Sequence, residues 1–109
     1  MGDQEGLAQS LSERILELDG VSQGKSRFGG GRAFFYNGKK EFCHFHHAGE
    51  VDVRIGLKEI SKLKDMIEGT DRFHHRSKSS QWLEIQFDRQ EELEQVLEFV
   101  EVAYKAVLG

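Results

Sequence analysis

Hydrophobic residues recur at helical spacing in three segments of the chain, residues 7–19, 57–68 and 89–107. In each segment the apolar positions lie three or four residues apart, which places them along one side of a helix. The pattern therefore predicts three amphipathic helices, each of which needs an apolar surface to cover.

The segment between the first two predicted helices has the pattern of β-strands. Residues 33–36 and 39–46 are separated by Asn37-Gly38, the dipeptide that best accommodates a two-residue hairpin turn. The polar segment 21–28 is expected to form a weaker strand at a sheet edge. Two further strands are predicted over residues 50–55 and 82–87.

Alternation in residues 50–55 sets the register of a second hairpin. A three-residue loop, 47–49, with Gly49 in the left-handed conformation, places apolar residues on one face and polar residues on the other. The expected cross-strand pairs are Phe45 with Val51, His44 with Asp52, and Cys43 with Val53.

Together these elements predict an α+β fold in the order α-β-β-β-β-α-β-α. We expect a two-layer sandwich with a mainly antiparallel sheet, helices on one face, and the other face open or partly covered. The whole chain, residues 1–109, is expected to be one domain. The polar connection over residues 70–80 is long for a compact domain, which favours a functional loop.

Composition narrows the function classes. The formal net charge of −4 argues against a dedicated binder of duplex DNA, which needs a basic face. Basic residues 25, 27, 32, 39 and 40 form a local cluster that could attract a small anion, although a solvated hairpin is the more common explanation.

No apolar run approaches the roughly twenty residues of a membrane span. Cys43 is the only cysteine and no signal peptide is evident, so we expect a cytoplasmic protein.

The predicted register places His44, His46, Asp52 and Arg54 together on the open face of the sheet. A carboxylate beside an imidazole raises its pKa, which suits a general acid or base. The alternative is a surface pair that contributes only to the stability of the sheet. Cys43 should point the opposite way, into the core, which excludes a nucleophile beside His44.

Histidine spacing also raises the question of a metal site. His44 and His46 share one strand face, and His74 or His75 could supply a third imidazole from the 70–80 connection, as in zinc or iron sites. Histidine-rich loops often bind no metal, so the sequence leaves both the metal and any other cofactor undecided.

Aromatic residues beside these histidines suggest a ligand. Trp82 and Phe42 are expected on the same open face, where they could stack on a planar molecule. The alternative is that this aromatic face binds a partner protein or a second copy of the chain in a homodimer. RNA is disfavoured because the face has no basic rim.

Several short motifs occur together in the chain: Arg27-Phe28-Gly29-Gly30, Gly38-Lys39-Lys40-Glu41, Cys43-His44-Phe45-His46, Asp52, Phe73-His74-His75 and Trp82. Together they resemble the luciferase-domain family of small bacterial and fungal proteins, which takes its name from fungal luciferases. The resemblance covers residues 21–108. This chain has Phe73 where the family usually has proline, and a basic, serine-rich stretch at 76–79.

The resemblance implies a chemistry. Fungal luciferases oxidise a planar polyphenolic pyrone with molecular oxygen, apparently without a flavin, so the family suggests an oxygenase-like or general-base enzyme. Residue by residue, it implies catalytic roles for His44, His46, Asp52 and His75, which should then converge within a few ångströms. It implies a ligand-binding role for Trp82; we add Arg54, Phe42 and His74 as further ligand contacts.

Overall fold

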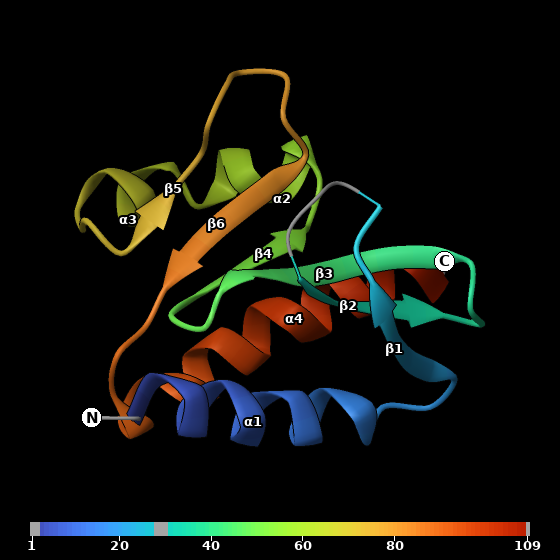
Figure 1. Cartoon of the computed structure of the whole chain (residues 1–109). Coiled ribbons are helices and arrows are strands. Elements are labelled where there is room, and N and C mark those ends of the chain that lie inside the picture. The colour runs from blue at the N-terminus through green and yellow to red at the C-terminus, as the bar shows by residue number, and fades with distance from the viewer. Residues whose placement is uncertain (1–2, 28–30, 109) are drawn as a thin grey trace.

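The computed structural model of the chain describes residues 3–27 and 31–108 (Figure 1). Its helices follow the predicted apolar stripes. They are α1 (Asp3–Leu16), α2 (Leu57–Lys62), α3 (Lys64–Glu68) and α4 (Leu93–Leu108), with a 3₁₀ turn, η1 (Gln90–Glu92), directly before α4.

Within the described residues, six strands form one antiparallel sheet in the spatial order β1-β2-β3-β4-β6-β5. The strands are β1 (Val21–Lys25), β2 (Arg32–Tyr36), β3 (Lys40–His47), β4 (Glu50–Arg54), β5 (Phe73–His74) and β6 (Trp82–Gln86).

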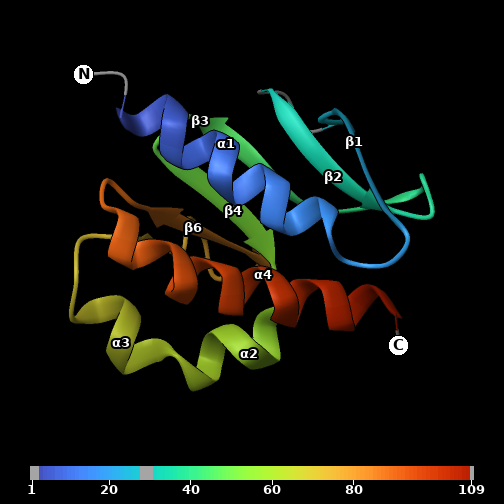
Figure 2. The same ribbon diagram turned by 90° about the horizontal axis from the view of Figure 1, so that it is seen from below.

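The helices all cover the same face of this sheet, so the core lies between one helical layer and one sheet layer (Figures 1 and 2). The inward side chains of α1, α4 and the strands are buried, and the removal of this apolar surface from water stabilises the fold. The largest of them are Phe34, Phe42, Phe73, Leu11, Ile15, Leu83 and Ile85.

The predicted α+β sandwich and its element order are confirmed, with differences in detail. The helix predicted over 57–68 is interrupted at Leu63, where the backbone leaves helical geometry and α2 gives way to α3. The 70–80 connection contains the two-residue strand β5, which pairs with β6. β1 lies at the sheet edge, as expected.

The Asn37-Gly38 hairpin turn is confirmed. Both residues have positive φ, 54° and 71°, as a turn between β2 and β3 with the right twist requires.

A β-bulge in β3 overturns the predicted position of Phe42. Phe34 pairs with Cys43 and Phe35 pairs with Glu41, so Phe42 is an extra residue with no partner on β2. The bulge turns Phe42 toward the helices, where its ring packs 5.8 Å from that of Tyr104. The prediction that Phe42 lies beside Trp82 on the open face is therefore wrong.

A second irregularity in β3 lies at His46. The three predicted pairs of this hairpin are confirmed, and His47 then pairs with Glu50, which leaves His46 unpaired in the register. The connection is therefore only Ala48-Gly49, and Gly49 is not among the described residues with positive φ. The predicted left-handed Gly49 is wrong because the bulge absorbs the extra residue.

Candidate functional site

A row of polar residues crosses the sheet on the face away from the helices. His44 of β3 lies opposite Asp52 of β4, Asp52 lies opposite Glu84 of β6, and Glu84 lies opposite His74 of β5. Because residues that pair across antiparallel strands point to the same face, imidazoles at both ends flank two carboxylates.

His44 lies between two carboxylates. Its Nδ1 is 2.9 Å from Oε2 of Glu41, its Nε2 is 3.1 Å from Oδ2 of Asp52, and the residue is 7% exposed. Burial by itself lowers the pKa of His44, but the hydrogen bond and charge of Asp52 and the charge of Glu41 outweigh it, so the pKa is raised. These contacts favour the imidazolium, which can donate through both nitrogens.

Glu41 reaches this site because of the bulge at Phe42. Its carboxylate also accepts hydrogen bonds from Ser26 Oγ at 2.7 Å and from the backbone N–H of Arg27 at 2.9 Å. These donors tie the segment after β1 to the open face and occupy the oxygens of Glu41, so a ligand would have to displace them to bind there.

The ring of Trp82, on β6, lies beside the imidazole of His44, on β3. Its ring centroid lies 4.8 Å from that of His44, at an interplanar angle of 48°, and its side chain is half-buried. Arg54 lies opposite Trp82 in the register and is exposed, with its Nε donating to Gln81 Oε1. These two predicted ligand-binding residues therefore lie side by side at one end of the polar face.

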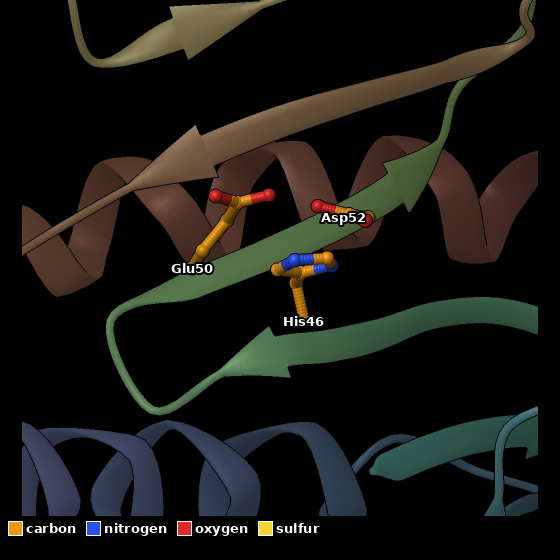
Figure 3. Close-up of side chains that lie close together, drawn as sticks. All are labelled: His46, Glu50 and Asp52. Atoms are coloured by element: carbon orange, nitrogen blue, oxygen red, sulfur yellow. The ribbon is translucent and has the colours of Figure 1, made fainter. Parts of the chain in front are cut away.

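A second cluster adjoins the first at Asp52. Figure 3 shows the carboxylates of Glu50 and Asp52 side by side above the ring of His46, and one ligand atom from each of the three lies within 4.8 Å of the others. Burial raises the pKa of Glu50, and Asp52 and Glu84 raise it further, whereas His46 opposes them.

Asp52 joins the two clusters through its two oxygens. Oδ2 faces His44, whereas Oδ1 is buried without a hydrogen-bond partner among the described residues. Asp52 is only 5% exposed. An acceptor buried in this way is costly unless something binds it, so Oδ1 would gain from a partner, whether a bound ligand or a protonated Glu50, whose pKa is raised by burial and by a hydrogen bond with Asp52.

A surface hollow of about 460 Å³ borders the polar face at Glu41 and Arg54. Its volume lies in the range of small-molecule sites. The basic residues that line it are Arg27, Lys39, Lys40 and Arg54, and its apolar wall includes Ile55, Ala106 and Val107.

The structure does not bring His75 to the other predicted catalytic residues. β5 is three strands away from β3, roughly 14 Å at the usual strand spacing. The Nε2 of His75 lies 2.7 Å from the carbonyl oxygen of Ser80, and the ring lines a different hollow, of about 670 Å³, along α2 and α3. His74 lies on the polar face but is exposed at its far end.

The predicted site residues thus divide into two groups. His44, His46, Asp52, Arg54 and Trp82 share the open face, whereas Phe42 and His75 do not. The set of three histidines considered for a metal is not assembled, because both nitrogens of His44 face carboxylates. The aromatic patch of Trp82 and Phe42 that the partner-binding alternative needs is not formed either.

Sequence reasoning missed two carboxylates of the site. Glu50 has the same strand parity as Asp52, so the alternation of residues 50–55 already pointed to it. Glu41 could not be found in that way, because only the bulge at Phe42 turns it onto this face. Cys43 is fully buried in the core, as predicted.

These features define a small α+β domain with helices on one sheet face and a buried carboxylate–imidazole cluster on the other. The family model of the Luciferase domain matches residues 39–103, and the chain belongs to this family. The match includes every polar residue of the central row and begins after the segment 27–30 that contributed to the resemblance. Comparisons with curated proteins and with solved structures give no significant match. Among the described residues, no helix is long and apolar enough to cross a membrane.

Proposed function

We propose that the polar sheet face binds a small planar organic ligand that carries an acidic group, and that Asp52 serves there as a proton acceptor. The observation that carries this proposal is the unpartnered Oδ1 of Asp52, in a carboxylate whose other oxygen is fixed by His44.

The binding part of the proposal follows from two successive cross-strand pairs between β4 and β6. Arg54 and Trp82 form one pair, and Asp52 and Glu84 form the next pair on the same face, about 7 Å further along the strands. A planar molecule of one or two rings spans that distance. Its anionic group would lie against Arg54 and the basic hollow, and its ring would contact the face of Trp82.

The chemical part concerns a hydroxyl at the other end of such a ligand. Oδ1 of Asp52 would accept that proton, while His44 holds the carboxylate in place. His44 is then a positioning residue, since both of its nitrogens face protein carboxylates. This differs from the role of general base that the sequence suggested, and it leaves proton abstraction as the reaction type.

Hydroxylated aromatic acids, with neutral analogues of the same shape, provide the test. Binding to chelator-treated protein is followed by the fluorescence of Trp82, the only tryptophan. We expect the acids to change the emission, the neutral analogues to bind at least about tenfold more weakly, and Arg54→Gln to weaken the acids similarly.

Arg14→Gln is the matched control, because Arg14 is an exposed arginine on α1 that pairs with Glu94. It should leave binding unchanged. The proposal fails if no acid perturbs Trp82 at millimolar concentration, or if Arg54→Gln and Arg14→Gln behave alike.

A further inference from the structure

Carboxylates gather at the centre of the polar face. Glu41 and Asp52 share one imidazole, that of His44, and Glu84 is paired with Arg76 at 2.9 Å.

The cationic partner of Glu50 is weaker than the partners of Glu41, Asp52 and Glu84. The Nε2 of His47 lies 3.7 Å from its Oε1, and the side chain of His47 is 56% exposed. Glu50 itself is only 7% exposed. A carboxylate buried beside other carboxylates is unfavourable without a cation, so the cluster lacks positive charge at this position.

The geometry around Glu50 fits a cation. One ligand atom from each of His46, Glu50 and Asp52 lies within 4.8 Å of the other two. Atoms that bind one ion at about 2.1 Å can be at most about 4.2 Å apart, so small side-chain rotations suffice. The exposed imidazole of His46 is free to make them.

A second observation, the hydrogen bonding of Asp52, points to the same place. Oδ1 of Asp52 is buried and has no hydrogen-bond partner among the described residues. It belongs to the carboxylate that Figure 3 shows beside Glu50 and above His46. An ion at this point would supply the partner that Oδ1 lacks.

We infer that His46, Glu50 and Asp52 bind a divalent first-row transition-metal ion. One imidazole and two carboxylates suit Mn²⁺, Fe²⁺ or Zn²⁺, whereas Mg²⁺ and Ca²⁺ prefer oxygen ligands alone. Three protein ligands leave coordination positions open on the exposed side of His46, where water or an organic ligand could bind.

This inference does not depend on the organic ligand. With the ion bound, Oδ1 of Asp52 would be a metal ligand and would not accept a proton from the organic ligand. The two proposals can fail separately, because the organic ligand is tested in chelator-treated protein and the ion is tested without any organic ligand.

Titration of the full chain with Mn²⁺ and then with Zn²⁺, by calorimetry and by the electron paramagnetic resonance signal of Mn²⁺, tests the site. We expect one ion per chain and at least about tenfold weaker binding in His46→Gln and in Glu50→Gln. Mg²⁺ should bind much more weakly than either ion.

Two matched variants serve as controls. His74→Gln removes an exposed imidazole on the same sheet face, and Glu98→Gln removes an exposed carboxylate on α4. Both should bind Mn²⁺ like the wild type. His46 is itself exposed, so His46→Gln should fold and remain informative even if Glu50→Gln does not.

The inference is overturned if neither Mn²⁺ nor Zn²⁺ binds at millimolar concentration. It is also overturned if binding survives His46→Gln but is lost in His74→Gln, since the ion would then lie at a surface histidine.

Discussion

Nε2 of His44 lies 3.1 Å from Oδ2 of Asp52 across the central strands of the sheet. Glu41 contacts the other ring nitrogen of His44, so the imidazole is held from both sides. The contact leaves Oδ1 of Asp52, rather than a nitrogen of His44, as the buried acceptor without a hydrogen-bond partner among the described residues. We therefore propose the carboxylate, rather than the histidine beside it, as the proton acceptor.

The raised pKa of His44 predicts how stability changes with pH. Because the folded protein binds this proton more tightly than the unfolded chain, the stabilisation is fully present below the ordinary pKa of 6.5 and is lost as the pH rises through the folded pKa. Glu50, whose pKa is also raised above its ordinary 4.5, has the same sign at lower pH. Urea unfolding of metal-free protein between about pH 6 and 9 measures the effect.

His44→Gln and His74→Gln separate this effect from other titrations. The free-energy difference between wild type and His44→Gln should be largest near pH 6 and shrink as the pH rises, whereas His74→Gln, at an exposed position, should differ little at any pH. A difference for His44→Gln that grows with pH would show that the imidazole is held neutral.

The environment of Cys43 predicts an unreactive thiol. The side chain is fully buried, and burial followed by the charge of Glu41 raises its pKa well above 9.0. We expect iodoacetamide at pH 8 to label the native protein at least about a hundredfold more slowly than the urea-unfolded chain. Rapid labelling of the native protein would mean that the sheet opens readily around β3.

Replacing glycine with alanine should change the stability of the protein in opposite directions at two positions. Gly6 lies in α1 with open space around it, so Gly6→Ala should stabilise the protein by about 0.5–1 kcal/mol. Gly38 has a φ of 71° in the hairpin turn, so Gly38→Ala should destabilise it by about 1 kcal/mol. Urea unfolding at one pH measures both changes, and changes of the same sign would contradict the assigned backbone conformations.

Local patterns were enough to predict the faces of the central hairpin. Asn37-Gly38 fixed one turn, and the alternation of Val51 and Val53 with Asp52 fixed which residues of β4 face the helices. These features depend on neighbours in the chain and on strand geometry, so they can be read without knowing the tertiary structure.

The remaining site residues depended on features that alternation does not encode. The bulge moved Phe42 into the core and Glu41 onto the open face, and the adjacent apolar residues Phe42 and Cys43 were the only hint of it. The position of His75 depended on where β5 joins the sheet, three strands from β3. Long-range strand order of this kind is set by packing against the helices.

Nitrogen NMR of the histidine side chains, in metal-free protein, tests most directly whether Glu41 and Asp52 hold a charged His44 in the sheet. We predict that both ring nitrogens of His44 carry protons at pH 6, that the midpoint lies above 6.5, and that Glu41→Gln lowers it. A single protonated nitrogen at pH 6, with a midpoint at or below 6.5, would contradict this arrangement of the site.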